Sequence, residues 1–142
     1  MTDPRPQPRV APLTLRDLSP LHILLIEDNP DIRELMKDLL ESGGHRVDDA
    51  ADGTLGLQQL MAAKPQLALI DIGLPDVDGY ALATRARALG SQSALVAMTG
   101  HDGVNARQRI LGSGFDAHIV KPFVIDLLAP LFHRLCPTPR TA

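Results

Sequence analysis

Several kinds of residue that mark other classes of protein are scarce in this chain of 142 residues. Aromatic residues make up 3% of it, tryptophan is absent, and Cys136 is the single cysteine, so the chain can form neither an internal disulfide nor a thiolate zinc site of its own. No apolar run approaches the roughly 18 residues that a membrane span needs, and the first residues lack the apolar core of a secretory signal. We therefore expect a cytoplasmic protein without a membrane span.

An excess of positive charge is also missing. The chain has 14 Lys and Arg residues against 17 Asp and Glu residues, a formal net charge of -3, and the basic residues are scattered. Because nucleic-acid binding depends on clustered positive charge, we expect no direct contact with nucleic acid. Hydrophobic residues make up 44% of the chain, which is typical of one ordinary domain with a substantial core.

The domain boundaries follow from proline and from apolar periodicity. Residues 1–20 contain five prolines and no clear period, which predicts an extended, poorly ordered leader. Residues 21–136 are predicted to form the domain, and residues 137–142 a short tail.

Within the domain, short apolar runs alternate with stretches of helical periodicity. The first helix should begin after Asn29-Pro30, a capping residue followed by proline, and end at Gly43-Gly44. Pro130 should make the last helix begin late, near Asp126, or kink it. Alternating strands and helices predict an α/β fold with a parallel sheet of five strands. The strands are expected at residues 23–26, 46–50, 67–71, 94–98 and 117–120.

Polar side chains stand where four of these strands end. Glu27-Asp28 follow the first, Asp71 ends the third, Thr99 follows the fourth and Lys121 follows the fifth. In an open parallel sheet, ligands bind outside the carboxyl ends of the strands. Each residue alone has an ordinary explanation as a turn former, a cap or a solvated charge. Together they predict a site.

The residue types indicate phosphoryl chemistry. Three carboxylates at close range repel one another, so either one of them should hold a proton or the cluster should recruit a cation, for which a hard divalent ion such as Mg²⁺ is suited. With that charge screened, Asp71 could attack phosphorus and form an aspartyl phosphate. Lys121 and the hydroxyl of Thr99 would then lie near the oxygens that gather charge in the transition state.

These residues also carry a resemblance to a known family. Glu27-Asp28, the run from Asp71 through Leu-Pro to Asp-Gly79, Met98-Thr99-Gly100 and Lys121-Pro122-Phe123 resemble, in this order, the receiver domain of bacterial two-component response regulators. The resemblance covers about residues 21–135. It implies a flavodoxin-like (βα)5 doubly wound parallel sheet with strand order 2-1-3-4-5, a fold for which a receiver is a reference example.

The resemblance implies roles for the acidic residues. Asp71 would accept a phosphoryl group from the phosphohistidine of a histidine kinase. Asp28, Asp71 and the carbonyl of Gly73 would bind Mg²⁺, and Glu27 would act through water. Such a chain assists its own phosphorylation and dephosphorylation and is not a turnover enzyme in the usual sense.

The resemblance also implies a switch. Thr99 would turn toward the phosphoryl oxygens, Lys121 would pair with them, and the Lys121-Pro122 bond would be cis. The family usually has Tyr or Phe three residues before the lysine, where this chain has His118. Whether His118 works as a switch residue is therefore an open question.

Other functions fit parts of the pattern. A Mg²⁺-dependent hydrolase of the haloacid dehalogenase type also forms an aspartyl phosphate, but it has an acid two residues after the nucleophile, where this chain has Gly73. A pseudo-receiver would bind partners without phosphate, which the complete set of site residues disfavours. Within the receiver interpretation, the chain could be a free single-domain regulator, a relay intermediate that passes phosphate to a histidine phosphotransfer protein, or a receiver from a hybrid kinase.

Overall fold

The computed structural model describes residues 13–100 and 104–137. Strands and helices alternate along these residues as the sequence predicts. The strands are β1 (His22–Ile26), β2 (Arg46–Ala50), β3 (Leu67–Asp71), β4 (Ala94–Thr99) and β5 (Ala117–Val120). The helices are α1 (Pro30–Ser42), α2 (Gly53–Ala63), α3 (Gly79–Ala88), α4 (Val104–Gly112) and α5 (Leu128–Leu135), with 3-10 turns η1 (Leu15–Asp17) and η2 (Ile125–Leu127).

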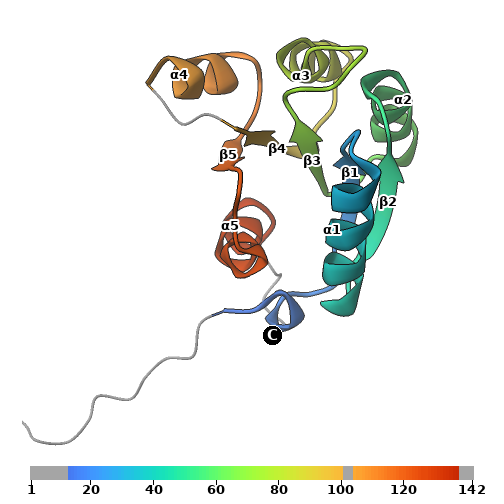
Figure 1. The fold of residues 1–142 in the computed structure, drawn as a ribbon, viewed down its shortest axis with the longest axis vertical. Coiled ribbons are helices and arrows are strands. Elements are labelled where there is room, and N and C mark those ends of the chain that lie inside the picture. Colours follow the sequence, from blue (N-terminus) through green and yellow to red (C-terminus); the bar gives the residue numbers. More distant parts are fainter. Residues whose placement is uncertain (1–12, 101–103, 138–142) are drawn as a thin grey trace, which may run out of the picture.

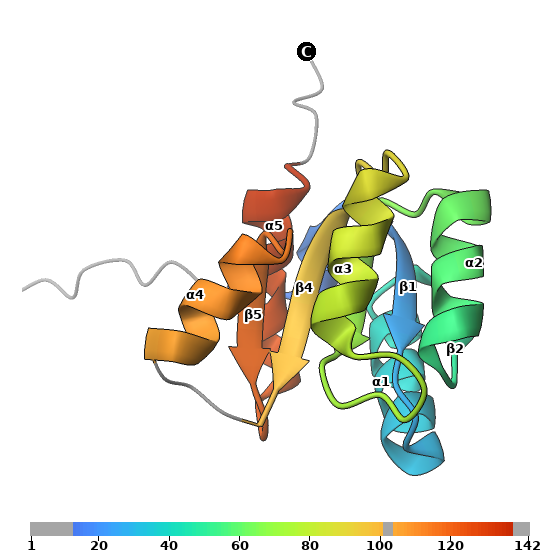
Figure 2. The same cartoon turned by 90° about the horizontal axis from the view of Figure 1, so that it is seen from above.

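The strands form one parallel sheet in the order β2-β1-β3-β4-β5, which confirms the predicted topology. Figure 1 shows α1 and α5 on one face of the sheet and α2, α3 and α4 on the other. In Figure 2 the visible arrowheads point toward the same edge, because parallel strands share their direction. Every strand-to-helix loop on this edge can therefore contribute to one site.

The core is double because helices cover both faces of the sheet, and the central strands are consequently apolar at nearly every position. Residues of β1, β3 and β4 point alternately to the two sides. One cluster lies against α1 and α5 and includes Leu25, Leu69 and Phe132. The other lies against α2, α3 and α4 and includes Ile26 and Ile70. A rigid double core of this kind fixes where each strand ends.

Local sequence signals set the helix ends. The side chain of Asn29 accepts hydrogen bonds from the N–H groups of Asp31 and Ile32 at 3.0 and 3.1 Å, and Pro30 is the first residue of α1. α5 begins only at Leu128, so Pro130 falls in its first turn, where an N–H has no partner within the helix. The predicted late start is confirmed. Among the described residues, no helix has the length and hydropathy to span a bilayer.

The segment before β1 packs more closely than the sequence suggested. Leu15 and Leu18 are buried in the cluster beside α1 and α5. The buried ring of His45 holds this segment, because its Nδ1 accepts the N–H of Leu21 at 3.0 Å and its Nε2 lies 2.8 Å from the carbonyl oxygen of Leu15. The structure thus shows packed chain within the predicted 1–20 leader. Residues 1–12, and residues 138–142 of the predicted tail, lie outside the described residues.

Candidate functional site

The three carboxylates that the sequence places at strand ends come together. Ile26 of β1 pairs with Ile70 of β3, so the residues that follow, Glu27 and Asp71, lie side by side at the carboxyl edge. Glu27, Asp28 and Asp71 can each direct one carboxylate oxygen into a cluster whose members lie within 4.8 Å of one another. Asp28 is exposed and Glu27 is buried, so the cluster extends from solvent into the protein.

Lys121 brings the positive charge. Its Nζ lies 3.2 Å from Oε2 of Glu27 and 3.4 Å from Oδ2 of Asp71, so one ammonium bridges two carboxylates. Lys121 follows β5 directly, and the Lys121-Pro122 peptide bond is cis, as the resemblance implies. The predicted meeting of Glu27, Asp71 and Lys121 at one edge is confirmed by the geometry.

The two neighbouring carboxyls titrate in opposite directions. Burial, and then a hydrogen bond and charge repulsion from Asp71, raise the pKa of Glu27 to about 7, although Lys121 acts against this. Burial alone would also raise the pKa of Asp71, but hydrogen bonds from Glu27 and from the N–H of Gly73, together with the charge of Lys121, lower it. Below about pH 7 the pair therefore holds a proton on Glu27, while Asp71 keeps its negative charge. The ionised member is the one that ends the central strand β3.

Thr99 and His118 lie on the α4 side of this centre. Thr99 is buried at the end of β4 and pairs in register with Val120. His118 pairs with Ala97, and since positions two residues apart share a face, His118 and Thr99 lie on the same face of the sheet. This is the face covered by α2, α3 and α4.

The loop after Asp71 turns sharply and closes on itself. The N–H of Gly73 donates to Oδ1 of Asp71 at 3.0 Å, and the N–H of Gly79 donates to the carbonyl of Ile72 at 3.1 Å. A Cβ on Gly79 would lie 2.7 Å from the Cα of Ile72, so only glycine permits this closure. The loop therefore begins and ends at nearly the same point beside Asp71.

Arg33 supports the first acidic loop, and no sequence pattern predicts this contact. Its Nη1 donates to the carbonyl of Glu27 at 2.9 Å, while its Nε lies 3.2 Å from Oδ2 of Asp49 on β2. A charged donor of this kind fixes the backbone that presents Glu27 and Asp28. A lone arginine one turn into a helix has no distinguishing pattern, so only the fold reveals its contact.

Arg109 of α4 makes a second unexpected contact. Its guanidinium lies 3.9 Å from the ring centre of Tyr80, and its Nη2 lies 3.2 Å from Oδ2 of Asp78. No pattern in the sequence predicts this contact. The helix α4 is thus tied to the start of α3, close to the loop that follows Asp71.

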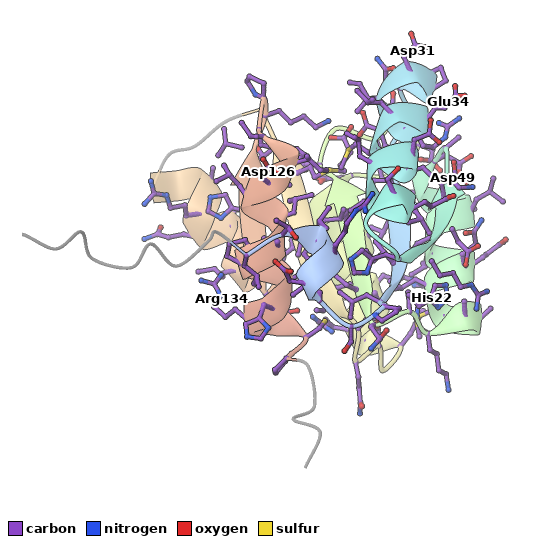
Figure 3. The ribbon with its side chains drawn as sticks, turned by 90° about the horizontal axis from the view of Figure 1, so that it is seen from below. His22, Asp31, Glu34, Asp49, Asp126 and Arg134 are labelled. Atoms are coloured by element: carbon purple, nitrogen blue, oxygen red, sulfur yellow. The ribbon has the colours of Figure 1, made fainter. Side chains whose placement is uncertain are left out.

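An apolar groove lies beside the site, between α1 and the loop after β5. Of its hydrophobic side chains, Leu35 is the most exposed, at 59%. Figure 3 shows Asp31 and Glu34 at one end of α1, on one side of this region, and Asp126 on the other side. The groove is lined by Ile32, Leu35, Met36, Leu39, Lys121, Pro122, Phe123 and Ile125.

The sheet order and the acidic cluster beside Lys121 define a flavodoxin-like α/β protein with its site at the carboxyl edge of the sheet. The model of the response regulator receiver domain family matches residues 23–132. The chain belongs to this family.

Individual relatives agree with this assignment. The virulence transcriptional regulatory protein PhoP of Salmonella typhimurium is 34% identical over 106 residues, which are 75% of this chain and 47% of that protein. The chain spans about half the length of the curated relatives it matches. A CheY-like response regulator receiver domain protein from Methanospirillum hungatei is 33% identical, with a TM-score of 0.75 over 82% of this chain and 94% of that one. The chemotaxis protein CheY4 of Vibrio cholerae, at 22% identity and a TM-score of 0.77 over 82% of this chain and 99% of that one, shares the fold.

The proton on Glu27 can be tested directly. In metal-free protein, the side-chain carboxyl of Glu27 should titrate near pH 7 in a carbon-detected NMR experiment. Asp71→Asn should lower this pKa because it removes a neighbouring negative charge, whereas Lys121→Gln should raise it because it removes a positive one. Lys64→Gln, at the end of α2, serves as the control and should leave it unchanged. Shifts of equal sign for Asp71→Asn and Lys121→Gln would contradict the assignment.

Proposed function

We propose that this chain is a phosphoacceptor receiver of a two-component or phosphorelay system. Asp71 takes a phosphoryl group from the phosphohistidine of a histidine kinase, with Mg²⁺ bound beside it, and the resulting change of conformation alters partner binding. The observation that carries this proposal is the ion pair of Lys121 with Asp71 inside the acidic cluster of Glu27, Asp28 and Asp71. This arrangement leaves one ionised carboxylate at the end of β3.

Asp71 is suited to be the nucleophile. Its pKa is lowered, so it is ionised at neutral pH, and its side chain keeps 13% of its surface exposed at the sheet edge. One carboxylate oxygen would attack phosphorus, the bond from phosphorus to the histidine nitrogen would break, and that nitrogen would leave with the bonding pair and take up a proton. Glu27 is buried and, with its pKa raised to about 7, is partly protonated at neutral pH, so it is the poorer nucleophile.

The acidic cluster fits a bound Mg²⁺. Carboxylate and carbonyl oxygens are the ligands this ion takes, and the cluster supplies several within a few ångströms. Asp28, Asp71 and the carbonyl of Gly73 would hold the ion, with Glu27 acting through water. The ion would screen negative charge so that a phosphoryl group can approach Asp71.

Lys121 and Thr99 would serve the phosphorylated state. Once Asp71 carries a phosphoryl group, the Nζ of Lys121 is within reach of its oxygens, since it already lies 3.4 Å from Asp71. The hydroxyl of Thr99, at the end of the next strand, would turn toward the same oxygens. His118 shares a sheet face with Thr99. Movement of Thr99 would therefore shift His118 and change the surface on the α4 side.

The kinase is the partner that this chemistry requires, and a cytoplasmic location would bring the two together. To deliver a phosphoryl group to Asp71, a kinase must cover the surface next to it. The apolar groove beside Lys121 is such a surface, because its leucines can be buried in a complex. A histidine phosphotransfer protein, or another downstream protein, would use the same chemistry in a relay.

Asp71 should be the sole phosphoacceptor. Incubation with acetyl phosphate and Mg²⁺ should add one phosphate to the intact mass of the wild-type chain, and Asp71→Asn should abolish the adduct. Asp48→Asn, on the edge strand β2, is the control and should keep it. An adduct on Asp71→Asn would refute the assignment, and rapid continuous release of phosphate would indicate the hydrolase instead.

Asp28 should be needed for cation binding. Without a cation, the negative charge of the acidic cluster opposes an incoming phosphoryl group by on the order of several kcal/mol at short range. Asp28→Ala should therefore lose Mg²⁺ binding in calorimetry and phosphorylation by acetyl phosphate with it. Asp31→Ala removes an exposed acid from the first turn of α1 and should retain both. Full phosphorylation in excess chelator would contradict the role of the ion.

The groove should matter for the kinase and not for a small donor. Leu35→Asp places a charge in the groove and should slow transfer from a phosphorylated histidine kinase by about tenfold or more, because an apolar contact is lost. Phosphorylation by acetyl phosphate should be unchanged. Leu89→Asp, at the end of α3 on the opposite edge of the sheet, should affect neither. An equal loss with both donors would show that Leu35→Asp disturbs the site itself.

A further inference from the structure

The loop between Asp71 and α3 is attached to a neighbouring helix by the side chain of Asp76. Oδ1 of Asp76 accepts the N–H of Gly53 at 2.8 Å, and Oδ2 accepts the N–H of Thr54 at 2.9 Å and its hydroxyl at 2.7 Å. Gly53 and Thr54 are the first residues of α2. One carboxylate thus joins the loop to the N-terminus of a helix that is distant in sequence.

These bonds occupy groups that a helix leaves unpaired. The first N–H groups of an α-helix have no partner within it and carry partial positive charge. Asp52, which precedes α2, accepts only the N–H of Leu55 at 2.8 Å, and Asp76 takes the N–H groups of Gly53 and Thr54. The hydroxyl of Thr54, and then the N–H of Gly53, lower the pKa of Asp76 to about 2, so Asp76 is ionised throughout the neutral range.

The loop and α2 also approach closely. A Cβ on Gly53 would lie 2.9 Å from Cβ of Val77 and 3.3 Å from Oδ1 of Asp76, so glycine is required at this contact. On the other side of Asp76, Leu74 is buried in the cluster beneath α2 and α3. The middle of the loop is therefore docked by one ion-dipole contact and two apolar side chains.

We infer that Asp76 is a positioning residue, which fixes the loop that carries Gly73 and thereby holds the Gly73 carbonyl beside Asp71 for a divalent cation. This inference rests on the proposed function for the presence of Mg²⁺ and for the Gly73 carbonyl as one of its ligands. Asp76 touches no reacting group. It acts through the backbone of the two residues between itself and Gly73, Leu74 and Pro75, a stretch too short to absorb much movement.

The physical reason lies in the demands of Mg²⁺. This ion requires near-ideal octahedral geometry, so a carbonyl ligand on a loop that samples several positions must be ordered when the ion binds. The cost of that ordering lowers affinity. A loop that is already docked to α2 is ordered when the chain folds, so no further ordering is needed when the ion binds. Loss of the Asp76 contact should therefore weaken Mg²⁺ binding even though every ligand remains.

The chain supplies a matched pair of variants for the test. Asp52→Ala and Asp76→Ala each remove a carboxylate that caps α2, but only Asp76→Ala releases the loop. In calorimetry, Asp76→Ala should weaken Mg²⁺ binding by about three- to tenfold, and Asp52→Ala by less than about twofold. Thermal unfolding of both variants measures the helix effect separately. Thr54→Val should reproduce part of the loss, and Thr54→Ser, which keeps the hydroxyl, should restore wild-type affinity.

The outcomes separate the inference from the proposed function. Equal Mg²⁺ affinities for Asp76→Ala and Asp52→Ala, or for Thr54→Val and Thr54→Ser, would overturn the positioning role while the wild-type chain still binds Mg²⁺. A wild-type chain that binds no Mg²⁺ would overturn the proposed function itself. If Asp76→Ala does not fold, the two Thr54 variants decide the question alone, because Thr54 is exposed, Val is isosteric with Thr, and Ser keeps the hydroxyl and lacks only the methyl group.

Discussion

The repulsion between carboxylates at one edge of the sheet is the constraint on which the rest of the structure depends. A parallel sheet brings the ends of β1 and β3 together, and the chain places an acid on each. Lys121, a proton on Glu27 and the backbone N–H of Gly73 each offset part of that repulsion. The double core makes this possible, because strands packed on both faces cannot shift to separate their ends. The packing of the core thus holds these charged groups close together at the carboxyl edge of the sheet despite their repulsion.

Much of the fold could be predicted because its signals are local. Apolar runs predicted the alternation of strands and helices. Asn29-Pro30 predicted the start of α1, and Pro130 predicted the late start of α5. The burial of Leu15 and Leu18 could not be predicted in the same way. Their contacts with α1 and α5, and the hydrogen bonds to His45, join residues far apart in sequence within a segment that has no period. Tertiary packing, which local patterns do not report, decided that segment.

The residues of the candidate site likewise differ in whether the sequence could predict them. Glu27, Asp28, Asp71, Thr99 and Lys121 could be predicted from strand ends, since topology alone brings those ends together. Arg33, Asp76 and Arg109 could not, although each contacts a loop of the site or a residue next to it. Each is a charged residue on a helix or in a loop, the commonest kind of surface residue, and its partner lies on another element. The candidate site residues at the strand ends are visible in this sequence, and the charged residues that contact their loops become visible only in three dimensions.

The N-terminal segment has a mechanical consequence. The chain reaches β1 only after Leu15 and Leu18 have entered the cluster beside α1 and α5, and the ring of His45 joins both ends of this stretch to the domain. A pulling force applied before Thr14 would be borne first by these buried leucines and by two hydrogen bonds to one imidazole. It would reach the strand next to the acidic loop only after they had yielded. Tension from before Thr14 would therefore load these contacts before it loads the strand next to the acidic loop.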